Sequence, residues 1–118
     1  MQKRISVIIP NYNGGRTIGK CLEALFASSY KSFEVVVVDD CSTDSSREII
    51  GRFPCRLIPL GEQSGASRAR NIGAQNSGGE VLFFIDADCI VQEDTLSLVD
   101  RAVDGNRGVV VGGTYTCL

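Results

Sequence analysis

Acidic side chains follow two apolar runs of the chain and could bind a metal ion and phosphate. Asp86 and Asp88 come directly after the apolar residues 81–85, and Asp39 and Asp40 follow the apolar residues 35–38. The chain turns at the end of a strand, so two carboxylates one residue apart there can converge on one cation and the phosphates that it carries. Ligands of open parallel α/β sheets bind beyond the carboxyl ends of the strands, so two strands that end in acids predict one shared site.

Three further side chains could complete such a site. Tyr12 follows the first apolar run and offers a ring for stacking, and Arg68 and Arg70 offer planar guanidinium groups that suit phosphate. Together with the acids, these are the groups that a nucleoside diphosphate needs. The simpler alternatives are that the aspartates only form turns and that the arginines lie in solvent on a helix.

Residues 14–20 match the phosphate-loop spacing G-x-x-x-x-G-K and lie between a predicted strand and a predicted helix. The next residue is Cys21, where that motif has a serine or threonine to hold magnesium, and Cys21 falls on the apolar stripe of the helix. We therefore keep a phosphate loop only as an alternative.

Composition restricts the other possibilities. The 118 residues include 14 acidic and 12 basic ones, with a net charge of −2, and this mixed charge gives no reason to expect a nucleic-acid partner. The chain has no histidine, which excludes Ser-His-Asp and Cys-His catalysis within it, and its five scattered cysteines predict reduced thiols. No apolar run approaches the roughly 20 residues of a membrane span. We expect a cytoplasmic protein, membrane-associated only through parts outside this chain.

Strand and helix patterns alternate and predict an α/β fold. The expected strands are residues 4–10, 33–39, 55–60, 81–85 and a fifth from 109, and the expected helices are 17–28, 45–52, 65–75 and 93–103. Ser45 and Glu48 could form a capping box for the second helix, and Gly73 weakens the third. The alternation predicts a mostly parallel, Rossmann-like sheet with helices on both faces. A strand pattern close to residue 118 has nothing to cover its edge, so we expect residues 1–118 to be part of a larger domain that is truncated at its C-terminal end.

Four segments of the chain resemble the family-two inverting glycosyltransferases with the GT-A fold. They are, in order, Ser6-Val7-Ile8-Ile9-Pro10-Asn11-Tyr12-Asn13, Val37-Val38-Asp39-Asp40-Cys41-Ser42-Thr43-Asp44, Ala69-Arg70-Asn71-Ile72-Gly73 and Phe84-Ile85-Asp86-Ala87-Asp88. The resemblance spans nearly the whole chain and implies that it is the half of the domain that binds a nucleotide-sugar donor.

The resemblance also implies roles for single residues. Pro10, Asn11 and Tyr12 would line the nucleotide pocket, with the Tyr12 ring against the base. Asp40 would accept from the base N–H, which favours a UDP-sugar. Arg70 or Arg68 would lie near the base or phosphate, Asp86 would contact the ribose, and Asp88 would hold Mn²⁺ or Mg²⁺. Cys41 and Cys89 depart from the family pattern, where glycine and aspartate are frequent.

In such a family the carboxylate that deprotonates the acceptor is expected beyond residue 118, so the fragment would be inactive alone. The sequence does not identify the sugar or the acceptor, which could be a glycan or a lipid. The alternatives are a phosphate-loop NTPase, a nucleotidyltransferase and a non-catalytic nucleotide-binding module.

Overall fold

The computed structural model describes residues 3–112 and 116–117. Its helices are α1 (Ile18–Phe26), α2 (Ser46–Ile50), α3 (Ala66–Gln75) and α4 (Thr95–Val103). Its strands are β1 (Ile5–Asn11), β2 (Phe33–Asp39), β3 (Arg56–Pro59), β4 (Val81–Phe84), β5 (Cys89–Ile90), β6 (Gly108–Val111) and β7 (Thr116–Cys117). The predicted alternation of strands and helices is therefore confirmed, and the short pair β5–β7 is the addition that the sequence pattern did not indicate.

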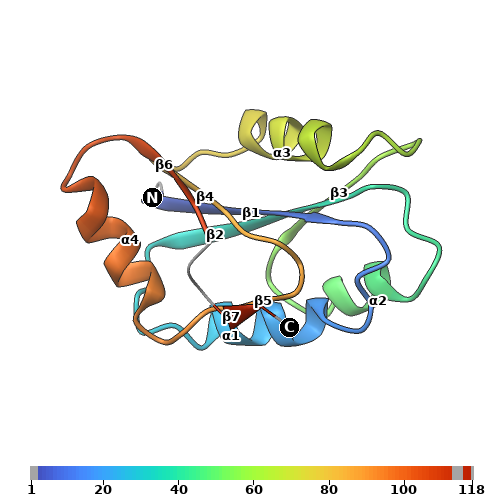
Figure 1. Cartoon of the computed structure of the whole chain (residues 1–118), viewed down its shortest axis with the longest axis horizontal. Coiled ribbons are helices and arrows are strands. Elements are labelled where there is room, and N and C mark those ends of the chain that lie inside the picture. The colour runs from blue at the N-terminus through green and yellow to red at the C-terminus, as the bar shows by residue number, and fades with distance from the viewer. Residues whose placement is uncertain (1–2, 113–115, 118) are drawn as a thin grey trace.

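Five of these strands form one parallel sheet in the order β3-β2-β1-β4-β6 (Figure 1). The chain runs outward from β1 through β2 to β3 and then returns to the other side of β1 as β4. The connections that follow β1 and β4 therefore diverge, and the crevice between them is where α/β sheets of this kind bind ligands. β5 and β7 pair separately and antiparallel.

Helices cover both faces of the sheet, as predicted. α3 lies on one face, and α1, α2 and α4 lie on the other (Figure 1). Successive residues of a strand point to opposite faces, so one apolar run supplies both layers. Val36 and Val38 of β2 pack with Ala69 of α3, whereas Val35 and Val37 belong to the larger core cluster on the opposite side.

The helices form where apolar residues recur at helical spacing. In α1 the buried residues Ile18, Cys21, Leu22 and Leu25 follow the i, i+3, i+4, i+7 pattern of a helix with one face against a core. Among residues 3–112 and 116–117, no helix has both the length and the apolar character needed to cross a bilayer.

The predicted capping box at α2 is wrong. Ser45 makes no side-chain hydrogen bond to the helix N-terminus. Asp44 does this instead, because its Oδ1 accepts from the Ser46 backbone N–H at 2.9 Å and from the Ser46 hydroxyl. The sequence offers several capping side chains in a row, and the tertiary position of the loop decides which one is used.

Gly73 was expected to weaken α3, but it allows the helix to approach the sheet. A Cβ atom at this position would lie 2.5 Å from Cγ2 of Ile8 and 3.2 Å from Cγ2 of Val38. Both neighbours are β-branched and fully buried, so neither can move away without repacking. The small residue therefore sets the distance between α3 and the two central strands.

We predict that Gly73→Ala destabilises the chain by about 1–3 kcal/mol, although alanine is the better helix former, because the added methyl group overpacks this contact. Urea unfolding measures the difference. Gly61→Ala is the matched control, since a Cβ atom there would meet no atom within 4 Å, and it should be close to neutral. Equal stability of wild type and Gly73→Ala would contradict the close contact.

Candidate functional site

A hollow of about 280 Å³, here called the strand-end hollow, opens where β1, β2 and β4 end. It is lined by Pro10, Asn11, Tyr12, Gly14, Thr17, Asp40, Ala66, Asp86, Ala87 and Asp88. The structure thus brings together six of the eight residues that the sequence nominated, and the two that lie elsewhere are Arg68 and Arg70. The hollow lies at the switch point between β1 and β4, as the sheet order requires.

The turn after β4 places two carboxylates and a thiol at one point. The backbone N–H of Cys89 donates to the carbonyl of Asp86 at 3.1 Å and closes the turn. The possible ligand atoms of Asp86, Asp88 and Cys89 all lie within 4.8 Å of one another. Asp86 is exposed, Asp88 is half-buried and Cys89 is buried, so the three side chains lie at increasing depth. This set of possible ligand atoms fits a divalent cation.

Asp40 lies at the rim of the hollow and also holds the start of α3. Its Oδ1 accepts from the Ser64 N–H at 2.6 Å, and its Oδ2 accepts from the Gly65 N–H at 2.9 Å. Gly65 has φ of +92°, a backbone conformation that glycine adopts without the steric penalty that other residues pay. Each carboxylate oxygen has a second lone pair, so Asp40 can still accept from a ligand. Its side chain is nearly buried, with 4% of the residue exposed.

The neighbouring acid, Asp39, points away from the hollow into the protein. The residue is fully buried, and its Oδ1 accepts from the Asn11 amide nitrogen at 2.9 Å and from the Ser42 hydroxyl at 2.6 Å. Its Oδ2 accepts from the Ser42 backbone N–H and pairs with Nε of Arg47. The two adjacent aspartates, which the sequence presented as one pair, therefore have different surroundings.

Asn11 belongs to the same buried network, because its amide nitrogen also donates to the Ser46 hydroxyl at 3.0 Å. Its backbone carbonyl accepts from the Asp40 N–H at 2.8 Å. The residue is 1% exposed, and within the described part of the chain its Oδ1 has no hydrogen-bond partner. Asn11 thus ties the end of β1 to the loop after β2, and a direct contact with nucleotide stays a prediction.

The surroundings of Asp39 shift the pKa of its carboxyl group. Burial alone would raise this pKa, but hydrogen bonds from Ser42, Arg47 and Asn11 together lower it below the ordinary value. The group therefore stays ionised in the folded chain, and its charge is balanced by the Arg47 guanidinium. Asp39 stabilises the fold as long as it is deprotonated.

Two residues with positive φ shape the loops above this network. Asn13 has φ of +51° and Cys41 has φ of +64°. The Asn13 side-chain oxygen accepts from the backbone N–H groups of Thr43 and Asp44, at 2.8 and 3.2 Å, so it joins the loop after β1 to the loop after β2. No such bond of the Cys41 side chain offsets its left-handed conformation in the described structure, which gives a physical reason why glycine suits this position.

The structure contradicts the phosphate-loop alternative. The backbone N–H of Gly15 donates to Oδ2 of Asp44, and that of Ile18 donates to the carbonyl of Gly14. These amides would have to face a phosphate in such a loop, but here they are already paired, one of them with a carboxylate. Lys20 lies exposed on α1 and Cys21 is buried in the core.

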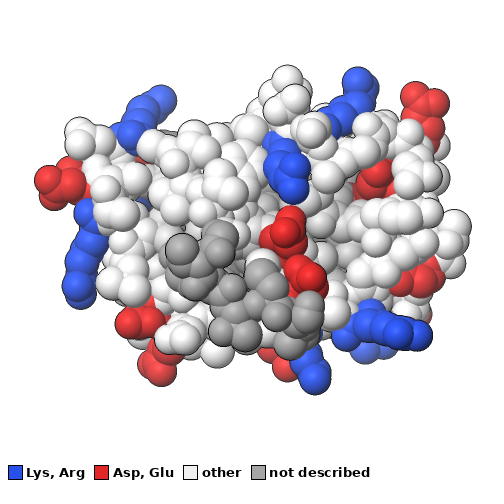
Figure 2. Space-filling model, in the orientation of Figure 1, with Lys and Arg blue, Asp and Glu red and all other residues white. Residues whose placement is uncertain are grey.

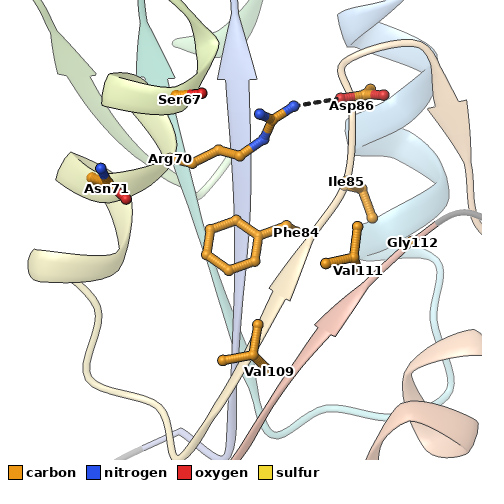
Figure 3. A pocket seen from close by; sticks show the side chains of 9 residues that line it. All are labelled: Ser67, Arg70, Asn71, Phe84, Ile85, Asp86, Val109, Val111 and Gly112. Carbon is orange, nitrogen blue, oxygen red and sulfur yellow. Dashed lines mark ion pairs between the residues drawn. The ribbon is translucent and has the colours of Figure 1, made fainter.

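Arg70 extends from α3 toward Asp86 and lines a second hollow (Figure 3), and Asp86 lines both hollows. Its Nη2 lies 3.5 Å from Oδ1 of Asp86, and both side chains are partly exposed. The second hollow has about 490 Å³ and includes Phe84, Val109 and Val111. Figure 2 shows acidic groups in the middle of this face with a basic group beside them, while other charges lie around the edge. Arg70 is therefore within reach of an anionic ligand at Asp86.

Arg68 lies apart from these residues. It lines a third hollow with Leu60, Glu62 and Ser64, between the loop after β3 and the outer side of α3. Of the two arginines that the sequence could not distinguish, the structure therefore places Arg70 beside the acids. Cys89, which the sequence marked only as a departure from the family pattern, lies with Asp86 and Asp88, and its position directly after Asp88 was a usable signal for a role in the site.

Comparisons with known proteins agree with this arrangement. The family model described as Glycosyl transferase family 2 matches residues 6–118. Glycosyltransferase GlyG of Streptococcus pneumoniae is 33% identical over 98% of this chain, and the chain spans 40% of the length of GlyG.

Solved structures extend the comparison to the fold. The Staphylococcus aureus TarS fragment 1–349 in complex with UDP-GlcNAc superposes with a TM-score of 0.81 at 32% identity, covering 86% of this chain and 31% of the TarS chain. The Pyrobaculum calidifontis mannosyltransferase PcManGT in complex with GDP-Man and Mn²⁺ gives a TM-score of 0.76 at 30% identity, covering 82% of this chain and 31% of that one. The predicted GT-A, Rossmann-like fold is confirmed.

We predict that Asp39→Asn lowers the free energy of unfolding by about 1–3 kcal/mol at neutral pH, because an amide cannot accept all the hydrogen bonds that Asn11, Ser42 and Arg47 donate to the buried carboxylate. The folded-state pKa of Asp39 lies below the unfolded value of about 3.9, so this stabilisation is present above that value and is lost as the pH falls through the folded-state pKa. Urea unfolding at several pH values should show the gap between wild type and variant closing in acid.

Glu48→Gln is the control for that measurement, because Glu48 forms an exposed pair with Arg52 at 4.0 Å, and the substitution should change stability by less than about 0.5 kcal/mol. A gap between wild type and Asp39→Asn that stays constant from neutral to acidic pH would contradict the assigned role of Asp39.

We also predict that Cys41→Gly stabilises the chain by about 1 kcal/mol, because glycine removes the steric cost of the left-handed conformation. Asn13→Gly relieves the same kind of strain but deletes the side-chain bonds to Thr43 and Asp44, so it should destabilise. Thermal unfolding of the two variants should give shifts of opposite sign, and shifts of the same sign would refute this interpretation.

Proposed function

The chain belongs to glycosyl transferase family 2, and from this premise we propose that it is the part of a sugar-transferring enzyme that binds a nucleoside-diphosphate sugar and a divalent cation. One observation carries the proposal: Tyr12, Asp40, Asp86 and Asp88, from three different strand ends, line one hollow at the switch point of the sheet. Membership of the family also excludes the NTPase and the nucleotidyltransferase as the class of this chain. The activity of the whole protein remains part of the proposal, since the chain spans 40% of GlyG.

In this proposal the base of the donor lies between the ends of β1 and β2. The Tyr12 ring is half-exposed at the rim of the hollow, where an aromatic face can stack on a base, and Pro10 lines the hollow beside it. Asp40 is an acceptor at the same rim, and uracil presents a ring N–H to such an acceptor. A UDP-sugar is therefore the donor that we propose. Support comes from TarS, whose solved complex contains UDP-GlcNAc.

The ribose and the diphosphate would lie toward the end of β4. Asp86 reaches the solvent beside Arg70, and because their ion pair is exposed and 3.5 Å long, a ligand can replace it at little cost. Arg70 is then free to approach the diphosphate, and Asp86 to accept from a ribose hydroxyl. Both roles require the ion pair between Arg70 and Asp86, drawn as a dashed line in Figure 3, to separate.

Asp88 is the residue that we propose for the cation, with Mn²⁺ or Mg²⁺ as the ion, and PcManGT in complex with Mn²⁺ supports this choice. The donor set of the turn fits such an ion, because carboxylates are the ligands that these hard cations take. When bound, the ion would neutralise charge that grows on the departing nucleoside diphosphate. The turn contributes by holding Asp88 half-buried at a fixed distance from Asp86.

We propose that the transfer inverts the sugar and that both the acceptor site and the carboxylate base come from a segment outside this chain. In the described residues, the acids of the strand-end hollow are already assigned to the base, the ribose and the cation. An acceptor hydroxyl needs a separate base within hydrogen-bond reach. This chain would therefore bind the donor without completing the transfer.

We predict that calorimetric titration with UDP in the presence of Mn²⁺ gives a binding signal for the wild-type chain and that Asp88→Ala weakens it roughly tenfold or more, about 1.4 kcal/mol. The loss should disappear when Mn²⁺ is replaced by a chelator, because Asp88 acts through the ion. No heat for wild type, or equal affinity for Asp88→Ala with Mn²⁺ present, would count against the proposal.

Two control variants sharpen the experiment. Asp94→Ala removes the same charge at the exposed residue before α4, outside the hollow, and should bind UDP like wild type. Lys20→Ala should also leave binding unchanged, since the backbone N–H groups of Gly15, Thr17 and Ile18 are paired within the protein and do not form a phosphate loop. A parallel titration with GDP tests the preference for uracil, because PcManGT was solved with a guanosine nucleotide.

A further inference from the structure

The turn after β4 contains a possible metal ligand to which the proposed function gives no role, the thiol of Cys89. Its Sγ lies within 4.8 Å of carboxylate oxygens of both Asp86 and Asp88. Two atoms bound to one ion at about 2.0–2.3 Å each lie at most about 4.6 Å apart, so the three side chains need only a small adjustment to share an ion.

The surroundings hold Cys89 in this position. The residue begins β5, is 1% exposed and belongs to the main core cluster, so its side chain lies beneath the two acids. The backbone bond from Cys89 N–H to the Asp86 carbonyl fixes the turn, and the Cys21 thiol of α1 donates to the same carbonyl at 3.8 Å. A ligand held by packing in this way needs little reorganisation to bind.

A second feature of the same hollow is a buried acceptor that has no donor within the described residues. Asn11 lines the same hollow, its residue is 1% exposed, and its buried Oδ1 accepts no hydrogen bond within the described residues. A buried acceptor without a donor is rare in folded proteins, and an ion or its water ligand would satisfy it. An anion would not satisfy the Oδ1 atom of Asn11, because this oxygen can only accept hydrogen bonds and an anion has none to donate.

We propose that Cys89 is a ligand of the cation that Asp88 holds and that it makes this site favour thiophilic divalent ions, such as Co²⁺ or Zn²⁺, over Mg²⁺. The proposal rests on the cation site of the proposed function. As the bond from Sγ to the metal forms, the thiol proton passes to solvent, and no group is oxidised or reduced. Thiolates suit borderline and soft ions, whereas Mg²⁺ takes oxygen ligands, so one sulfur in the set shifts the preference.

Titration of the reduced wild-type chain with Co²⁺ tests the proposal, because a bound thiolate gives a sulfur-to-cobalt charge-transfer band in the near ultraviolet that oxygen ligands do not. We expect this band for wild type and for Cys41→Ser, whose half-buried thiol lies outside the cluster. Cys89→Ser should lose the band and bind Co²⁺ at least about tenfold more weakly, since even outer-shell partners of a metal contribute that much.

Cys89→Asp tests the preference for thiophilic ions over Mg²⁺, because it replaces the sulfur by a carboxylate and keeps three possible metal ligands. Excess Mg²⁺ should displace Co²⁺ from this variant more readily than from wild type. If wild type binds Co²⁺ with visible bands but without the sulfur-to-cobalt band, the proposal is overturned. This result does not depend on whether any variant folds. A band that persists in Cys89→Ser, or equal displacement by Mg²⁺ from wild type and Cys89→Asp, would also overturn the proposal.

The outcome also separates this inference from the proposed function. If UDP and Mn²⁺ bind in an Asp88-dependent way while Co²⁺ shows no sulfur band, only the role of Cys89 fails. If neither UDP nor Co²⁺ binds, the cation site and the donor site fail together.

Discussion

The buried carboxylate of Asp39 is the interaction on which the site end of this fold depends. It joins the end of β1, through Asn11, to the loop after β2, through Ser42, and to α2, through Arg47. The carboxylate is fully buried and accepts all of these bonds, so removing it would leave the buried Asn11 amide with one acceptor fewer and would release the links to Ser42 and Arg47. The loops that carry Tyr12 and Asp40 are held in place by this network.

The four strand-end acids show how neighbouring carboxylates acquire different roles. Successive residues of an extended chain point to opposite sides, so Asp39 turns inward while Asp40 reaches the rim of the hollow. After β4 the chain turns instead of continuing straight, so Asp86 and Asp88 lie on the same side. The different surroundings of the four acids therefore follow from the direction of the backbone, and the thiol of Cys89 lies close to the second pair.

Much of the fold could be predicted from the sequence, because it depends on local patterns. The apolar run of β2 ends at Asp39 in both the prediction and the structure, and the alternation of elements was enough to predict the parallel sheet. The features that the sequence did not indicate depend on contacts between distant segments. The buried position of Asn11 depends on its hydrogen bond to Ser46, and the close packing at Gly73 depends on contact with Ile8. The position of the loop before α2 determines which side chain caps that helix. None of these contacts follows from a local sequence pattern.

We propose that the ends of β1, β2 and β4 bind one nucleoside diphosphate through one cation. A crystal structure of the chain with UDP and Mn²⁺ is the decisive measurement. We expect uracil against the Tyr12 ring and beside Asp40, with Mn²⁺ at Asp88 and beside the diphosphate. Nucleotide bound elsewhere on the sheet, or Mn²⁺ bound away from Asp88, would contradict it.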